Sequence, residues 1–216
     1  MELSETDKAF FNDGYKLGLE AAEKGFSKES LYASTTRMFE AVDGLIDSLL
    51  SYAKRENVNI DCKKGCSYCC YQPIYLVSHE VDYLYDHIKR NFSNEKQRQV
   101  LKKAAKLNEQ RKKMDKQELM NHKAPCPLLD SKGNCMTYTA RPMACRIYLS
   151  MSVASCRLFY EDPVPAGNYA KLFEFPLQAG RMMNEGFTHA LKTAGRNSAE
   201  FRIEEGLTII SGGGQK

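Results

Sequence analysis

The sequence lacks the features that mark several large classes of protein. It contains no apolar run near the roughly 18–20 residues that a membrane-spanning helix needs. The first residues, MELSETDKAFF, are too acidic and polar to form a secretory signal. We therefore expect a cytoplasmic protein with no membrane partner.

Motifs of common enzyme chemistry are equally scarce. No acid/base pair, nucleotide-binding loop or nucleophile motif stands out, and there is no internal repeat and little strand signal. The four histidines are scattered along the chain, so a surface or hydrogen-bonded position is favoured over metal ligation for each. These absences leave open whether the protein is an enzyme.

The composition is that of a folded chain. Hydrophobic residues make up 43% of the 216 residues and charged residues 27%, which excludes a wholly disordered or fibrous chain. The length corresponds to about one domain. Within it we distinguish an N-terminal helical pair at 1–57, a cysteine-cluster metal-binding region at 58–160 and a C-terminal helical segment at 161–216.

Apolar residues at helical spacing predict two helices before the first cysteine. Ser4, with Asp7 three residues later, predicts the start of the first helix, and Gly25 predicts its end. Ser27 is the expected cap of a second, long amphipathic helix over 28–56. Its apolar stripe indicates ordinary core packing.

Further helices are expected between and after the cysteines. A short helix is capped by Ser78, a longer one runs over 94–121, and two more lie near 177–194 and 203–210. Residues 124–160 are rich in proline and glycine and predict loops. The expected fold class is mainly α, a helical domain with two irregular cysteine-rich metal-binding loops.

The predicted helix over 94–121 is strongly basic. From Lys96 to Lys123 there are ten Lys and Arg residues against three Asp and Glu residues, whereas the whole chain has a net charge of +4. Long solvated helices often carry such charge. The basic helix 96–123 also fits an acidic partner or a nucleic acid, although it lacks interleaved aromatic residues.

Eight cysteines form two clusters in the middle of the chain. In a reducing compartment, clustered cysteines more often hold metal than form disulfides. The first cluster is Cys62, Cys66, Cys69 and Cys70, and the second is Cys126, Cys135, Cys145 and Cys156.

The spacing of the first cluster is typical of metal-binding loops. Cys66 and Cys69 are separated by two residues, which lets a tight turn direct both sulfurs to one point, and Gly65 gives the backbone freedom for that turn. Side chains of adjacent residues usually diverge, so Cys69 and Cys70 seldom bind one ion and one cluster is not expected to complete a site alone. The second cluster is therefore expected to supply further ligands.

The ligand set stays open within these limits. Thiolates suit both zinc and iron, and eight cysteines are enough for two four-cysteine zinc sites or for one to two iron–sulfur clusters. Cys70 and Cys156 are the last choices as ligands. The predicted metal ligands are Cys62, Cys66, Cys69, Cys70, Cys126, Cys135 and Cys145.

Several motifs occur in a fixed order around the two clusters. They are Cys62-x3-Cys66-x2-Cys69-Cys70, then Cys126-Pro127-Leu128-Leu129, Gly133-x-Cys135, Tyr138 and Arg141-Pro142-x2-Cys145-Arg146. This pattern resembles the YkgJ-type cysteine cluster family, which is described as a zinc- or iron-chelating domain. The resemblance covers about residues 60–150, includes Glu80 and leaves Cys156 unmatched. A more distant similarity to bacterial flagellin lysine methylases implies that an iron–sulfur cluster is an option.

Two arginines flank Cys145. A metal held by four thiolates carries a net charge of about −2, and a partly buried charge of that size needs nearby cations. We therefore predict Arg141 and Arg146 as contacts of the bound group. Arg141 can alternatively donate hydrogen bonds to loop carbonyls and join the two clusters.

Other interpretations of the cysteines are weaker. The spacing of Cys62, Cys66 and Cys69 also fits a radical S-adenosylmethionine motif, but no βα repeat surrounds it. A disulfide framework does not suit the expected compartment, and a redox dithiol needs a strand-to-helix setting.

Three functions remain. The first is a metal-binding protein with zinc or an iron centre, the second is an iron–sulfur-dependent redox or group-transfer (methyltransferase-like) enzyme, and the third is a zinc-stabilised nucleic-acid or protein interaction module.

Overall fold

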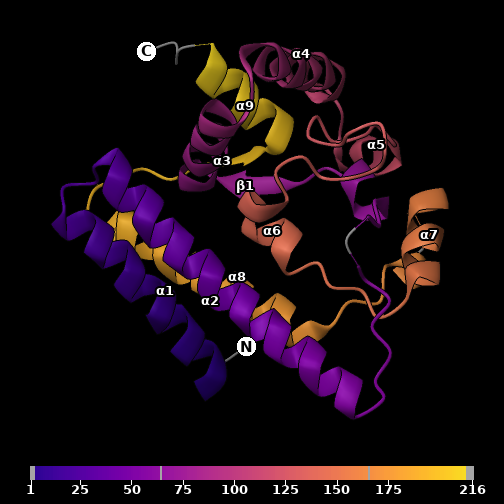
Figure 1. Ribbon diagram of the computed structural model, residues 1–216, viewed down its shortest axis with the longest axis horizontal. Helices are drawn as coiled ribbons and strands as arrows, with labels where there is room; N and C mark the ends of the chain where they lie inside the picture. Colours follow the sequence, from indigo (N-terminus) through magenta and orange to yellow (C-terminus); the bar gives the residue numbers. More distant parts are fainter. Residues whose placement is uncertain (1–2, 64, 165, 213–216) are drawn as a thin grey trace.

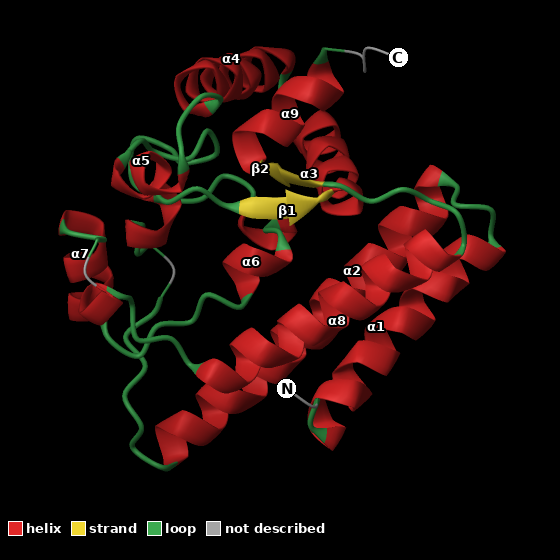
Figure 2. Cartoon of the chain, turned by 180° about the vertical axis from the view of Figure 1, so that it is seen from behind, coloured by secondary structure: helices red, strands yellow, loops and turns green. Residues whose placement is uncertain are grey.

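The computed structural model describes residues 3–63, 65–164 and 166–212 and is mainly α-helical, as predicted (Figures 1 and 2). The longer helices are α1 (Glu5–Glu23), α2 (Lys28–Arg55), α3 (Ser78–Asn91), α4 (Asn94–Arg111), α7 (Val153–Glu161), α8 (Glu174–Thr193) and α9 (Ile203–Ser211). Two short helices, α5 (Lys116–Asn121) and α6 (Met143–Arg146), lie among the loops. Strand β1 (Tyr75–Val77) pairs antiparallel with β2 (Glu200–Arg202), with Leu76 opposite Phe201.

The first layer consists of α1, α2 and α8, which lie nearly side by side (Figure 1). The predicted capping box is confirmed, since Ser4 Oγ accepts from the backbone N–H of Asp7 at 3.1 Å. Gly25 follows α1 with φ of +68°, and Ser27 caps α2. Helix α8 begins three residues before the predicted 177, and its core side chains pack against α1 and α2.

The second layer consists of α3, α4, α9 and the two strands (Figure 2). A second apolar cluster, which includes Leu84, Val100 and Leu207, forms its core. Inside this layer the fully buried Arg111 of α4 pairs with Glu204 of α9, with 3.3 Å between Nη1 and Oε1. Helix α6 lies between the two layers, and the loops that carry the cysteines run beside it.

Three local predictions were wrong. The helix expected over 94–121 is two helices, because Asp115 accepts from the backbone N–H groups of Gln117 and Glu118 and starts α5. Ser78 is the first residue of α3 rather than its cap; its hydroxyl bonds the backbone of Ala199 instead. The segment expected to be loops contains α7, whose start is capped by Ser152.

The basic residues of 96–123 fall on α4, α5 and the connections that follow them. Val100, Ala104 and Leu107 of α4 face the second core, and most of the Lys side chains are exposed. Among the described residues, no helix has both the length and the apolar character to cross a bilayer. The acidic or nucleic-acid partner and the three-segment division of the chain stay predictions.

Candidate metal centre

The first cysteine loop is a series of tight turns between α2 and β1. Gly65 has φ of +94°, a conformation that favours glycine, and the backbone N–H of Cys66 donates to the carbonyl of Lys63 at 3.1 Å. Cys69 and Cys70 lie in a 3-10 turn over Tyr68–Tyr71. The turn that Gly65 was predicted to allow is therefore present.

A backbone hydrogen bond joins the two cysteine clusters. The N–H of Cys126 donates to the carbonyl of Cys70 at 2.7 Å, although the two residues are far apart in the sequence. A second link runs from the N–H of Cys62 to the carbonyl of Ser150 at 3.1 Å. The loops thus meet through their backbones at points next to the cysteine side chains.

Glu80 anchors the short helix that carries Cys145. Its carboxylate accepts from the N–H of Val77 at 3.0 Å and from the N–H of Met143 at 2.7 Å. The side chain is buried, and burial raises the pKa of Glu80. Since Met143 is the first residue of α6, Glu80 fixes the start of α6 relative to β1 and α3.

Arg146 is held by protein groups on three sides. It is 4% exposed, its Nε donates to the carbonyl of Arg141 at 2.7 Å, and its other nitrogens donate to the carbonyl of Thr139 and to Asp43 of α2. Its guanidinium also lies 4.2 Å from the ring centroid of Phe39. Arg146 therefore fixes the segment before α6 to α2, and the roles predicted for Arg141 and Arg146 at the bound group stay predictions.

Arg141 faces the cysteines. Its guanidinium stacks 3.8 Å from the ring centroid of Tyr138, and its Nε donates to the Tyr138 carbonyl at 3.0 Å. Burial raises the pKa of the thiols of Cys62 and Cys145, and a hydrogen bond with Cys70 together with burial raises that of Cys69; the positive charge of Arg141 offsets a part of each rise. Arg141 is thus an electrostatic contact of thiols from both clusters.

The thiols influence one another across the two clusters. A hydrogen bond with Cys70 and burial raise the pKa of Cys69. Burial raises the pKa of Cys145, and the neighbouring Cys69 and Cys135 raise it further. Burial also raises the pKa of Cys126, with Cys145 and Cys135 acting in the same direction. Cys69 and Cys145 are therefore the point at which the clusters adjoin.

Cys156 joins the first cluster in space. It is buried on α7, which packs against the Tyr68–Tyr71 turn. Burial raises the pKa of its thiol, and Cys66, Cys69 and Cys62 raise it further. The sequence grouped Cys156 with the second cluster and ranked it last because the family pattern leaves it unmatched; in the structure, helix α7 places it beside the first cluster.

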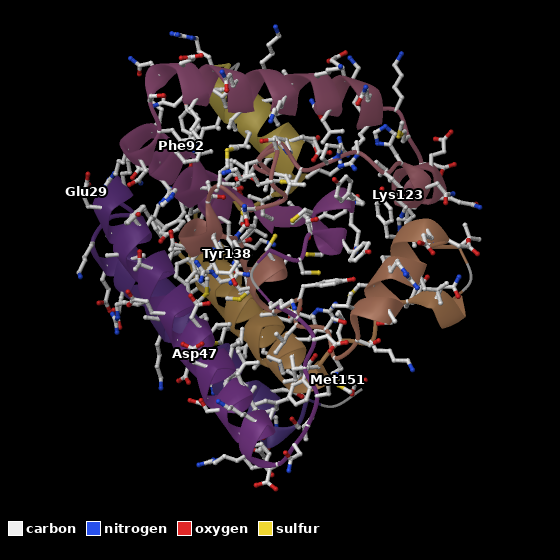
Figure 3. All side chains as sticks on the ribbon, turned by 45° about the vertical axis from the view of Figure 1, so that its right-hand side comes forward. Glu29, Asp47, Phe92, Lys123, Tyr138 and Met151 are labelled. Atoms are coloured by element: carbon white, nitrogen blue, oxygen red, sulfur yellow. The ribbon has the colours of Figure 1, made fainter. Side chains whose placement is uncertain are left out.

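A cavity of about 740 Å³ opens on the thiols. Cys62, Cys66, Cys69 and Cys145 border it on one side, and α2 forms the opposite side. Asp47 and Tyr138, which both border it, are labelled in Figure 3. The cysteine side of the cavity also includes Arg141 and Tyr148, and burial raises the pKa of Tyr148 to about 12.

The donor set fits a thiolate-bound metal. All eight cysteines are free thiols, so the alternative of a disulfide framework is wrong. Within the described ranges, no three His, Cys, Asp or Glu side chains are gathered tightly enough to hold an ion as they stand. The thiols of both clusters influence one another and have the cation of Arg141 beside them, and a bound metal requires them to come closer together.

Comparison with models of protein families gives a match in this region. Residues 61–162 match the CxxCxxCC family. Its description is "putative zinc- or iron-chelating domain", and the match confirms the family resemblance predicted from the sequence. The CxxCxxCC domain includes all eight cysteines, α6 and α7, and therefore extends beyond the predicted limit of 150 to Cys156.

Neither the curated proteins nor the solved structures contain a match to this chain. The match of residues 61–162 to the family model is what supports zinc or iron binding.

Proposed function

We propose that the protein holds zinc or an iron centre through cysteines from both clusters. The observation that carries this proposal is the hydrogen bond from Cys126 to Cys70, next to the electrostatic contact of Cys69 with Cys145. The proposed ligands are Cys62, Cys66, Cys69, Cys126, Cys135 and Cys145, followed by Cys70 and then by Cys156.

The surroundings of the thiols support this assignment. Buried thiols are poor acids, and a bound metal ion supplies the positive charge that makes them thiolates. Arg141 adds a second positive charge beside Cys62, Cys69 and Cys145. A structural zinc site of this kind contributes on the order of 10 kcal/mol to folding. Arg146 then serves to hold the loop before α6 in place.

The experiment is elemental analysis of protein purified without oxygen. Zinc in a fixed ratio to protein and a colourless sample identify a zinc site. Iron with acid-labile sulfide and a brown sample identify an iron–sulfur cluster. Protein without bound zinc or iron, before and after reconstitution, contradicts the proposal.

Substitution in the first cluster tests the ligands. Cys66→Ser is expected to lower both the metal content and the free energy of unfolding, because a neutral hydroxyl is a weaker ligand than a thiolate. Ser67→Ala is the matched control in the same loop and should keep the metal. Equal metal content in both variants removes Cys66 from the ligand set.

A second candidate function is redox or group-transfer chemistry at an iron–sulfur cluster. The cavity of about 740 Å³ beside four of the thiols supports it, because a catalytic centre needs room for a substrate. The protein residues would bind and orient that substrate, with Arg141 as a cation beside the thiols. Azide titration of the iron-loaded protein separates the candidates: a changed visible spectrum indicates an open iron position, and an unchanged one indicates saturation by cysteine.

A further inference from the structure

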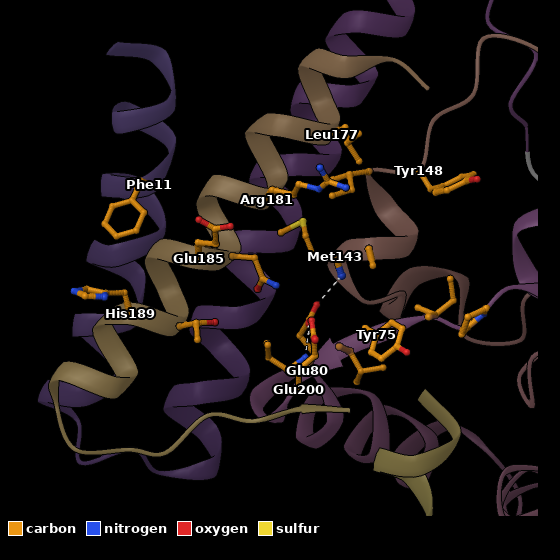
Figure 4. A pocket seen from close by; sticks show the side chains of 18 of the residues that line it. Phe11, Tyr75, Glu80, Met143, Tyr148, Leu177, Arg181, Glu185, His189 and Glu200 are labelled. Atoms are coloured by element: carbon orange, nitrogen blue, oxygen red, sulfur yellow. Dashed lines mark hydrogen bonds between the residues drawn. The ribbon is translucent and has the colours of Figure 1, made fainter. Parts of the chain in front are cut away.

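A second cavity, of about 660 Å³, lies between α8 and the side of α6 and β1 (Figure 4). This volume is within the range of about 300–1,000 Å³ that small organic ligands occupy. Gln72 and Tyr148 both border it, and Gln72 Nε2 donates to Tyr148 Oη at 3.2 Å. Tyr148 also borders the cavity of the thiols, so its ring separates the two spaces.

Polar side chains of helix α8 border this second cavity as a stripe along the helix. The stripe follows helical spacing, so its members lie on one face of the helix. They are Arg181, Asn184, Glu185, Thr188, His189 and Lys192. The other face of α8, with Met183 and Phe187, packs in the first core. Asn184 and Thr188 are half-buried along this cavity, whereas Arg181, Glu185, His189 and Lys192 lie at its solvent-exposed margin.

The opposite wall is mostly apolar. Ile74, Leu76, Met143 and Ile147 contribute to it, and Leu177 borders the same end of the cavity as Tyr148. Glu80 lies in this wall, but both of its carboxylate oxygens accept backbone N–H groups. The wall thus offers a surface for an apolar body, and its exposed charge is that of Glu200 of β2, which lies near Glu80 (Figure 4).

Arg181 is the cation at this end of the cavity. In the described part of the chain, its guanidinium has neither an ion pair nor a hydrogen bond. Figure 4 shows it extended toward α6, whereas Glu185, one turn later on α8, points away from it. A guanidinium in this position has donors suited to a bidentate contact with an oxyanion.

We propose that this cavity binds a small organic oxyanion, whose charged group contacts Arg181 and whose apolar body lies against α6 and β1. Carboxylates and phosphate esters share this chemistry. Such a ligand would lie beside Tyr148, on the far side of that ring from the thiols. The proposal goes beyond metal binding and rests on the cavity alone, so it can fail while the metal site stands.

Calorimetric titration of the purified, metal-containing protein tests the proposal with two probes of equal shape and opposite charge. Benzoate is expected to bind with saturation and at least tenfold more tightly than benzylamine. Arg181→Met keeps the aliphatic stem of an exposed side chain and should weaken benzoate binding about tenfold. Arg98→Met, an exposed arginine on α4, is the matched control and should leave the affinity unchanged.

A charge reversal gives an independent test that does not depend on loss of binding alone. Arg181→Glu is expected to bind benzylamine more tightly than benzoate. Comparing the affinities of phenyl phosphate and benzoate then shows whether the cavity prefers a phosphate ester or a carboxylate. The proposal is overturned if wild-type protein binds neither anion or prefers benzylamine, or if Arg181→Met binds benzoate as tightly as Arg98→Met does.

Discussion

At the scale of single residues, Glu80 connects parts of the chain that only the fold brings together. Its two oxygens accept from Val77 before α3 and from Met143 at the start of α6. Cys145 follows Met143 by two residues, so the carboxylate positions one of the proposed ligands without contacting it. The family resemblance included Glu80, but no pattern in the sequence showed what it would bond.

Glu80→Gln is expected to lower the free energy of unfolding by about 1–3 kcal/mol, because an amide can satisfy only one of the two buried N–H donors. Denaturant unfolding measures the loss, and metal content should fall with it. Glu109→Gln, at an exposed position of α4, is the control and should change neither quantity. A Glu80→Gln protein as stable as this control would contradict the role of Glu80.

His79 is a buried imidazole with a pH-dependent effect on stability. It is 2% exposed and lies 4.5 Å from Phe187 between ring centroids. Burial lowers the pKa of His79 from 6.5 to about 3. Between these pH values the unfolded chain takes up a proton at His79 and the folded protein does not.

The free energy of unfolding should therefore fall as the pH drops below 6.5, with His79 contributing up to about 1.4 kcal/mol per pH unit. Unfolding in urea from pH 7.5 to 5.5 measures the slope. In His79→Leu the slope of the free energy of unfolding against pH should be smaller by up to about 1.4 kcal/mol per pH unit, which corresponds to one proton. This difference does not depend on the absolute stability of the variant. Identical slopes in the two proteins would show that His79 is not kept neutral by the fold.

At the scale of elements, the packing of α1 against α8 depends on glycines inside both helices. A Cβ atom on Gly14 would lie 1.9 Å from the carbonyl oxygen of Met183, and one on Gly186 would lie 2.0 Å from that of Phe11. A glycine inside a helix ordinarily weakens that helix. In the structure Gly186 allows the two backbones to come into contact.

Gly14→Ala and Gly186→Ala should each destabilise the protein by about 1–3 kcal/mol or more, because backbone rather than a flexible side chain must move. Gly44→Ala on α2 is the matched control, since no atom lies within 4 Å of its added methyl group. The Gly44→Ala protein should be more stable than the wild-type protein by roughly 0.5–1 kcal/mol. Thermal unfolding of the three variants gives the comparison, and a neutral Gly14→Ala would contradict the close approach.

Helix ends were predictable where a local hydrogen bond decides them. Ser4 and Ser27 cap their helices as expected, because the partner N–H lies three residues away in the sequence. Asp115 carries the same signal, but the continuous run of charged residues around it concealed the break. Ser78 could not be predicted, since its partner Ala199 comes from a distant part of the chain.

At the scale of the whole molecule, spacing in the sequence indicated that the cysteines belong to one region, and the two loops do meet at Cys70 and Cys126. The place of Cys156 could not be predicted, because it depends on how α7 packs on the first loop. The burial of Arg146 rather than Arg141 has the same origin. Both residues flank Cys145, and only the position of α2 with Asp43 decides which one is buried.

The central claim is that cysteines from both clusters share one metal centre. The most direct test is the metal content, per protein chain, of Cys69→Ser, Cys145→Ser and the double variant, all purified without oxygen. A shared centre predicts that either single substitution lowers the content as far as the double substitution does. Single variants that each lose a separate part of the metal, with losses that add in the double variant, would contradict the account.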